Sequence, residues 1–148
     1  MIRVFLVVAF ATIGILACKT KKNAGTTTDS PAVAKTGQKP AFNVDLLVNT
    51  WKHSREEDTQ GARTYRPETY NFPPSRGPRT TYSFDKKGGM VKAYAGPTDG
   101  YVEEKGTYTI EGDKIIANLT NEKGKYTTSF QVISLADGVL KMKDLYGQ

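Results

Sequence analysis

The stretch Gly106–Lys143, "GTYTIEGDKIIANLTNEKGKYTTSFQVISLADGVLKMK", decides the fold of this chain. Its apolar and polar residues alternate with a period of two, which is typical of strands that bury one face. Gly112-Asp113 and Asp137-Gly138 suit tight hairpins, and Asn121–Gly124 suits a four-residue hairpin loop. Strands joined this closely must be antiparallel. The stretch therefore predicts strands at residues 106–111, 114–120, 125–135 and 139–143.

The same pattern extends toward the N-terminus. We expect one helical turn at residues 45–48, strands at 51–55, 80–84 and 90–95, and a five-residue hairpin loop at 85–89. Alternation assigns one side of the sheet to a set of mostly apolar side chains: Tyr82, Phe84, Tyr108, Ile110, Ile115, Ala117, Leu119, Tyr126, Thr128, Phe130, Val132, Leu140 and Met142. The alternation breaks between Val132 and Leu135, which predicts a bulge or a sharp bend.

A sheet with one apolar face and one polar face can bury the apolar face by closing into a barrel, which also removes the sheet edges. We therefore predict an all-β fold, a small antiparallel up-and-down β-barrel, for residues 41–148. A domain of this length has room for a filled interior or for one small ligand.

Several motifs of this barrel resemble the lipocalin-like domains of small bacterial lipoproteins. Trp51 resembles the tryptophan of the lipocalin Gly-x-Trp motif, with Asn49 in place of the glycine, and "GTYTIEGDKI" (106–115) is similar to a strand and hairpin of that group. The segments "YRPETYNFPPSRGPRTTYSF" (65–84) and "GPTDG" (96–100) resemble a block of its uncharacterised members. The resemblance covers residues 44–143 and implies a fold more than a function, because one architecture hosts many roles.

The N-terminus has the layout of a signal peptide. Met1–Arg3 carries one positive charge, Val4–Leu16 is nearly all apolar, and Ala17 precedes Cys18, the only cysteine. The apolar run is short for a membrane span, which needs about 20 residues. Ile15–Cys18 resembles the lipobox of bacterial lipoproteins, which implies cleavage before Cys18 and a diacylglycerol on its sulfur. The alternatives are a secretory signal with an incidental cysteine and an uncleaved anchor helix.

We therefore expect a cleaved signal peptide at residues 1–17 and a lipidated flexible tether at 18–40, ahead of the barrel. Residues 23–40 contain too few large apolar side chains to fold. Two or three acyl chains on Cys18 would hold the protein stably in the lipid of a bacterial envelope membrane. Lys19 stands where some bacteria use aspartate to retain lipoproteins in the inner membrane, so we expect the outer membrane. The side of the membrane stays open.

The net charge of +6 does not indicate nucleic-acid binding. Six of the 21 Lys and Arg residues and one of the 15 acidic residues precede Ala41, which leaves 15 basic and 14 acidic residues in the folded part. A nucleic-acid-binding domain would be strongly basic itself. We expect the lysines nearest to Cys18 to be attracted to anionic lipid headgroups.

Residues 58–79 predict a long loop, which in a compact domain is usually functional or disordered. The segment holds Pro67, Pro73, Pro74 and Pro78, with Arg63, Arg66, Arg76 and Arg79 among Tyr65, Tyr70 and Phe72. In one interpretation, arginine forks bind a ligand's carboxylate or phosphate while the rings cover its apolar body. In the other, Tyr70 and Phe72 plug one end of the barrel and the arginines pair with Glu56, Glu57, Asp58 or Glu68.

Two functional hypotheses follow. In the first, the barrel binds a small hydrophobic or amphipathic ligand. The candidate ligand-binding residues are Trp51, Arg66, Arg76, Tyr82, Tyr94, Tyr108, Tyr126 and Phe130. In the second, the interior is filled and the domain docks another envelope protein.

The chain offers little for catalysis, so we do not expect an enzyme. His53 is the only histidine, and Ser54 beside it faces the other way on a strand, so the two cannot act as a base and its nucleophile. We expect no metal and no cofactor. We expect Glu103-Glu104 and Glu56–Asp58 to be solvent-exposed acidic runs. A hydrolase built on carboxylates remote in sequence stays open.

Overall fold

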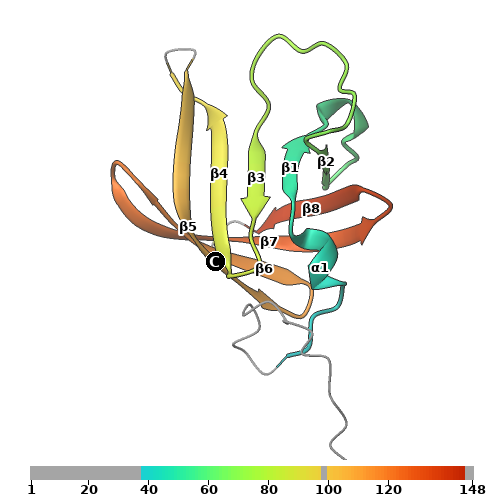
Figure 1. Cartoon of the computed structure of the whole chain (residues 1–148), viewed down its shortest axis with the longest axis vertical. Helices are drawn as coiled ribbons and strands as arrows, with labels where there is room; N and C mark the ends of the chain where they lie inside the picture. The colour runs from blue at the N-terminus through green and yellow to red at the C-terminus, as the bar shows by residue number, and fades with distance from the viewer. Residues whose placement is uncertain (1–37, 98–99, 146–148) are drawn as a thin grey trace, which may run out of the picture.

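The computed structural model describes residues 38–97 and 100–145, in which eight strands close into a barrel (Figure 1). The elements are α1 (Val44–Leu47), β1 (Thr50–His53), the short 3-10 helix η1 (Arg55–Glu57), β2 (Arg63–Pro67), β3 (Thr81–Phe84), β4 (Gly89–Ala95), β5 (Tyr101–Glu111), β6 (Lys114–Asn121), β7 (Gly124–Ala136) and β8 (Val139–Leu145). The predicted all-β antiparallel barrel is confirmed. The expected signal peptide, Cys18 and the tether up to residue 37 lie outside the described residues.

No helix within the described residues is long and apolar enough to cross a bilayer.

The order of the strands differs in one place from a simple up-and-down succession. Around the barrel it is β1-β2-β8-β7-β6-β5-β4-β3, so β1 lies between β2 and β3. The prediction of one long loop at residues 58–79 was wrong, because this segment contains β2. Tyr65 on β2 pairs with His53 on one side and with Leu140 on the other. Sequence patterning missed β2 because the strand is short, ends on a proline and buries two consecutive residues, Thr64 and Tyr65.

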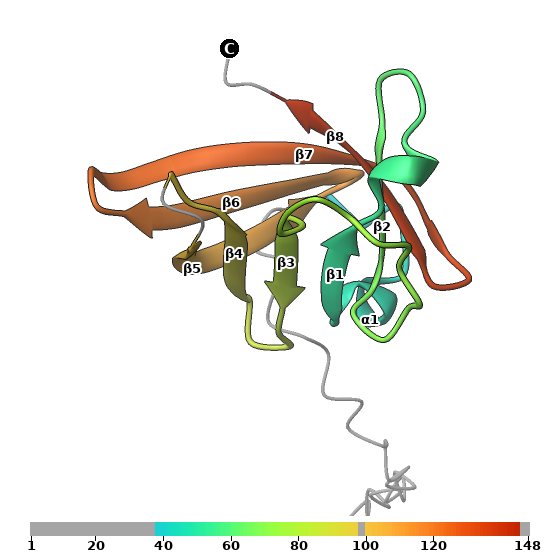
Figure 2. The same cartoon turned by 90° about the horizontal axis from the view of Figure 1, so that it is seen from above.

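The core contains the side chains that alternation assigned to one face, except Thr128, which is only half-buried. Leu47, Trp51, Tyr65 and Met90 join them, and Tyr126 is only half-buried. Figure 2 shows β1, β3 and β4 on one side of the barrel and β7 on the other. Across this interior the rings of Tyr82 and Phe130 meet at 5.2 Å between centroids. The barrel is therefore filled by aromatic rings at this level.

The turns and the bend follow the sequence closely. Asp137 and Gly138 both have positive φ, 52° and 69°, as a two-residue hairpin of matching twist requires. The register of β7 against β8 shifts between Val132 and Ser134, which confirms the predicted bulge.

The loop between β2 and β3, residues 68–80, lies against the outer face of β1 and β2. The ring of Phe72 has the Lys52 ammonium 5.7 Å away and the Arg79 guanidinium 5.1 Å away. Arg66 lies 5.0 Å from the ring of Tyr70. The idea that Tyr70 and Phe72 plug one end of the barrel was wrong, since these rings pack on outward-facing cations. The loop is held as a strap across β1.

Two bidentate arginine pairs hold η1, one from Arg79 on the strap and one from Arg66 on β2, as one of the interpretations required. Arg79 is buried and donates to both carboxylate oxygens of Glu56, at 2.9 and 2.8 Å, and to the carbonyls of His53 and Pro73. Arg66 forms the second bidentate pair, with Glu57, and its Nε lies 2.8 Å from Oε2 of that residue. Bidentate pairs of this kind add geometric specificity.

The bidentate pair of Arg66 and Glu57 predicts that the stability of the fold depends on pH in the acid range. The hydrogen bond from Arg66 lowers the pKa of Glu57 from 4.5 to about 2. The pair's stabilisation is therefore complete above pH 4.5 and is lost as the pH falls toward 2. Between pH 5 and pH 2 we expect the wild type to lose more unfolding free energy than Glu57→Gln does. Because the pair is partly exposed, the difference should be at most about 1 kcal/mol. Urea denaturation between pH 5 and pH 2 measures this. Arg66→Gln should give the same flattening, and an unchanged acid slope in both variants would contradict the assignment.

Gly106 allows β6 to lie against β5 at the bend of the sheet. A Cβ atom at this position would lie 1.8 Å from the carbonyl oxygen of Asn118. Because backbone atoms of a central strand cannot move aside cheaply, we expect Gly106→Ala to lower the unfolding free energy by at least about 2 kcal/mol. Gly77→Ala is the matched control, since a Cβ there meets nothing within 4 Å. Equal melting temperatures for the two variants would refute this explanation.

Candidate functional site

The barrel forks at the end opposite α1. β4 stays paired with β5 as far as Ala95 and Tyr101, and β6 with β7 as far as Asn121 and Gly124. The pairing between β5 and β6, however, ends at Lys105 and Thr120. The β4–β5 hairpin therefore separates from the β6–β7 hairpin, and Figure 1 shows the first pointing up and the second reaching to the left. We call this divergence the fork.

Glu104 lies at the base of the fork, one residue beyond the last pair between β5 and β6. Its side chain faces the interior and is only 2% exposed. One carboxylate oxygen accepts hydrogen bonds from the Tyr94 hydroxyl at 3.0 Å and from the Asn121 amide at 3.2 Å. The other accepts from the Lys92 ammonium at 3.0 Å and from the Tyr126 hydroxyl. We call these five residues the Glu104 cluster.

The Glu104 cluster joins the two hairpins through side chains where the backbone ladder has stopped. Lys92 and Tyr94 come from β4, whereas Asn121 and Tyr126 come from β6 and β7. Because all four donors converge on one carboxylate, the cluster fixes the opening of the fork.

The electrostatics favour an ionised carboxylate beside an ionised ammonium. Burial alone would raise the pKa of Glu104, but the hydrogen bonds from Tyr126, Lys92 and Asn121 outweigh it and hold the pKa below its ordinary value. Burial would lower the pKa of Lys92, but the hydrogen bond to Glu104 raises it. Burial and then the Glu104 hydrogen bond raise the pKa of both tyrosines, Tyr94 and Tyr126. The tyrosines therefore stay neutral donors to a charged pair.

A hollow of about 830 Å³ opens between the two hairpins, next to Tyr94 and Asn121 of the Glu104 cluster. We call it the rim hollow. Its lining consists of Tyr94, Ala95, Gly96, Pro97, Tyr101, Val102, Glu103, Asn121, Glu122 and Lys123. Two of these residues, Tyr94 and Asn121, also donate to Glu104. The rim hollow therefore combines an apolar wall from β4 and β5 with a polar floor.

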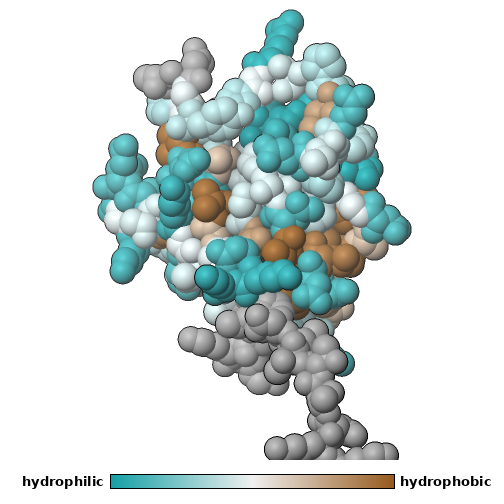
Figure 3. All heavy atoms as spheres, in the orientation of Figure 1, coloured by the Kyte–Doolittle hydropathy of each residue, from teal (hydrophilic) through white to brown (hydrophobic). Residues whose placement is uncertain are grey.

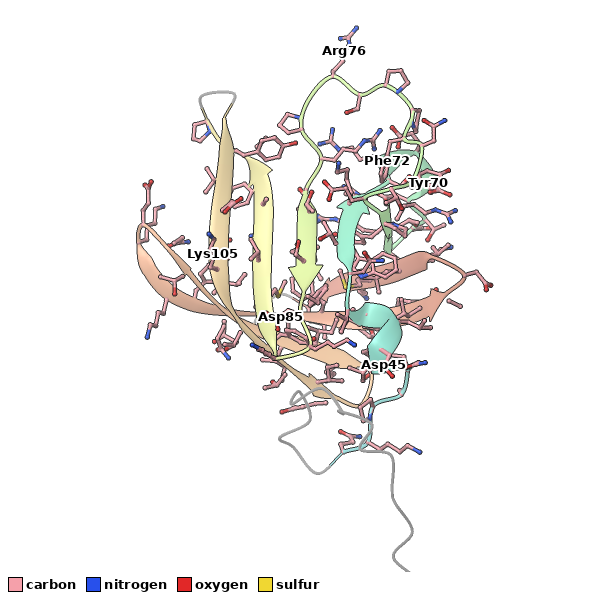
Figure 4. All side chains as sticks on the ribbon, in the orientation of Figure 1. Asp45, Tyr70, Phe72, Arg76, Asp85 and Lys105 are labelled. Atoms are coloured by element: carbon pink, nitrogen blue, oxygen red, sulfur yellow. The ribbon has the colours of Figure 1, made fainter. Side chains whose placement is uncertain are left out.

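The structure separates the eight ligand-binding candidates into three groups. Tyr94 and Tyr126 meet at Glu104. Arg66 lies on the outer face, in its bidentate pair with Glu57. Arg76 projects at the tip of the strap (Figure 4). The other four are buried in the packed core: Trp51, Tyr82, Tyr108 and Phe130. Two of their polar groups already have protein partners, since the Trp51 indole donates to the Leu47 carbonyl and the Tyr108 hydroxyl to that of Asp85. The ligand-binding role of all eight stays a prediction.

Sequence reasoning missed Glu104, Lys92 and Asn121. The expectation that Glu103 and Glu104 are both solvent-exposed was wrong for Glu104, because β5 begins at Tyr101 instead of Gly106. Extending the alternation of Ile110 and Tyr108 backwards would have placed Glu104 on the inward face. Glu103, on the opposite face, is exposed as expected.

His53 lies away from the Glu104 cluster. Its ring packs on Tyr65 at 5.2 Å between centroids, and its Nε2 lies 2.9 Å from an oxygen of Asp58. Nearby, Arg63 forms an ion pair with Asp144 at 2.9 Å, and burial raises the pKa of Tyr65 to about 12. Within residues 38–97 and 100–145, no group of three or more His, Cys, Asp or Glu side chains is arranged to hold a metal ion.

The Glu104 cluster predicts strong coupling between its members. We expect Glu104→Ala to lower the unfolding free energy by about 3 kcal/mol or more, because it leaves a partly buried ammonium and three other donors without their acceptor. The double variant Glu104→Leu/Lys92→Met should lose less than the sum of Glu104→Leu and Lys92→Met. Glu103→Ala is the control, with an expected loss of about 0.5 kcal/mol or less for an exposed residue. Urea denaturation that ranks Glu104→Ala with Glu103→Ala would contradict this picture.

Comparison with known proteins identifies the family to which the chain belongs. Among solved structures, a lipocalin-like protein from Bacteroides uniformis is 17% identical, with a TM-score of 0.37 over 68% of this chain and 99% of the other. No curated protein matches the chain. The family described as lipocalin-like domain matches residues 47–142, which span the barrel from Leu47 on α1 to Met142 on β8. The chain therefore belongs to the lipocalin-like domain family.

Proposed function

We propose that this protein is a lipid-anchored lipoprotein of the bacterial cell envelope whose barrel binds a small amphipathic ligand in the rim hollow. The observation that carries the proposal is the continuity between this hollow and the buried Glu104 cluster. Ligand sites of proteins combine an apolar lining with a few fixed polar groups, in volumes of about 300 to 1,000 Å³. The rim hollow, at about 830 Å³, has that size and that division.

The two ends of the ligand would meet different surfaces. An apolar chain or ring would contact Tyr94, Pro97 and Val102 on the wall. A polar head would reach Asn121 and the Glu104 cluster at the floor. Since Tyr82 and Phe130 fill the barrel below, the ligand would stay in its upper part.

The start of the described chain and the rim hollow lie at opposite ends of β5. The described chain begins beside the hairpin between β5 and β6, where the Ala41 amide donates to the Gly112 carbonyl at 2.8 Å. Figure 3 shows apolar side chains gathered over α1 at this end, where Leu46 is 48% exposed. The rim hollow lies at the far end of β5. In this proposal the lipid anchor is on Cys18, at the start of the tether. Because Lys19 follows Cys18, we assign this anchor to the outer membrane.

A second candidate function is docking of another envelope protein. The observation that favours it is the strap, in which Arg79 is fixed to Glu56 while the segment 73–78 projects with Arg76 at its tip (Figure 4). A rigid exposed segment loses little conformational entropy on binding.

A binding assay tests the ligand site. We expect the protein to bind amphiphiles with short apolar tails, measured by displacement of a fluorescent amphipathic dye. Val102→Asp should weaken binding by about tenfold or more, because it puts a charge into the apolar wall. Ile133→Asp is the control, since Ile133 is 52% exposed on β7. Equal affinities of folded Val102→Asp and Ile133→Asp would exclude the rim hollow as the site. Undiminished binding after deletion of residues 73–78 would separate this site from the strap.

A fractionation experiment tests the anchor. We expect Cys18→Ala to abolish incorporation of labelled palmitate and to move the protein out of the membrane fraction of its native host, because the acyl chains supply the membrane affinity. Cys18→Ser keeps the side-chain size and is expected to behave in the same way. Unchanged labelling and fractionation would rule out lipidation at this position.

A further inference from the structure

The Lys92 ammonium occupies a cage of two aromatic rings and one carboxylate. Its Nζ lies 4.8 Å from the ring centroid of Tyr94, 5.7 Å from that of Tyr126, and 3.0 Å from Glu104. It also donates to the Tyr126 hydroxyl at 3.2 Å. Ring faces and a carboxylate around one point are the surroundings that proteins use to recognise ammonium groups. We infer that the cage recognises the ammonium group of a cationic amphiphile, and that Lys92 occupies the place of that group when no ligand is bound. The inference rests on the proposed ligand-binding function and adds the class of ligand.

The charge of the cage selects for a cation. Without the Lys92 ammonium, the remaining groups are a buried carboxylate, three neutral donors and two negative ring faces. A ligand carboxylate would meet Glu104 and be repelled, whereas a hydroxyl would leave the buried charge uncompensated. Only a positively charged head group restores neutrality at this point.

Lys92, rather than Glu104, is the partner that can leave. Glu104 is 2% exposed and keeps three other donors, Tyr94, Asn121 and Tyr126, when the ammonium moves away. The Lys92 side chain is 24% exposed and has a flexible four-carbon stem. A lysine that swings into solvent recovers hydration and rotamer freedom. An incoming ammonium can therefore replace the internal one with little change in the rest of the cage.

The rim hollow supplies the path and the place for the tail. Tyr94 belongs both to the cage and to the wall of the hollow, so a head group that displaces the Lys92 ammonium would have its tail beside Tyr94 at the edge of the apolar wall. The rim itself carries balanced charge, because Glu103 and Glu122 lie with Lys123, and Lys105 lies 3.3 Å from Glu103. The charge of the ligand head group is therefore selected by the cage and not by the rim.

Calorimetric titration of the full chain, as the cell produces it, tests this inference with three probes that share one tail: hexylammonium, hexanoate and 1-hexanol. We expect hexylammonium to bind the wild type about tenfold or more tightly than the other two. We expect Lys92→Met to bind hexylammonium about tenfold more tightly still, because the internal competitor is gone. Lys114→Met is the control, since Lys114 is exposed at the start of β6, at the end of the barrel away from the cage, and its affinity should equal that of the wild type.

The outcomes separate this inference from the proposed function. If hexanoate or hexanol binds the wild type as tightly as hexylammonium, the barrel binds ligands but the cage does not select an ammonium, and the inference is overturned. An unchanged or weaker affinity of folded Lys92→Met for hexylammonium also overturns it. The ranking of the three probes on the wild type decides the matter even where Lys92→Met does not fold. If none of the probes binds either chain, both the proposed function and this inference fail.

Discussion

The buried carboxylate of Glu104 is the constraint on which the upper part of the barrel depends. A charge taken out of water costs several kcal/mol unless it is paired and hydrogen-bonded. Glu104 meets this requirement only when both hairpins are in place, because its donors come from β4, β6 and β7. The backbone ladder between β5 and β6 has already ended at this level. The Glu104 cluster therefore replaces backbone pairing and makes a defined opening compatible with a closed barrel.

The interior of the barrel changes from apolar and filled at one end to polar at the other. Toward α1, large side chains such as Trp51, Tyr82 and Phe130 fill the interior, and their burial stabilises the closed sheet. Toward the fork, charged and hydroxyl groups take the place of these large side chains. Less apolar surface is buried there, and the floor of the rim hollow is polar. The same chain can thus be stable without disulfides and still offer a hollow with chemical selectivity. On the outer face, Arg79 of the strap and Arg66 of β2 join their elements to η1 through Glu56 and Glu57.

Much of the fold, but little of the site, could be predicted from the sequence. Alternation and turn residues located seven of the eight strands, because both are local properties of the chain. β2 escaped because its short pattern has meaning only beside His53 and Leu140, which are distant in sequence. Tyr94 and Tyr126 were recognised as candidates because both were expected to be inward-facing tyrosines. Alternation extended backwards from Tyr108 would have placed Glu104 inward, but its convergence with these tyrosines depends on where the pairing of β5 with β6 ends, which no local pattern encodes.

The most direct test of this account is a pH titration of the Glu104 side-chain carboxyl, followed by carbon-13 NMR in the folded protein. The account predicts that the carboxyl stays ionised below about pH 4.3, the ordinary midpoint of a glutamate, because its four donors outweigh the effect of burial. Glu104→Gln identifies the resonance. A midpoint above about pH 4.3 would mean that burial dominates, and that no charged cluster holds the fork.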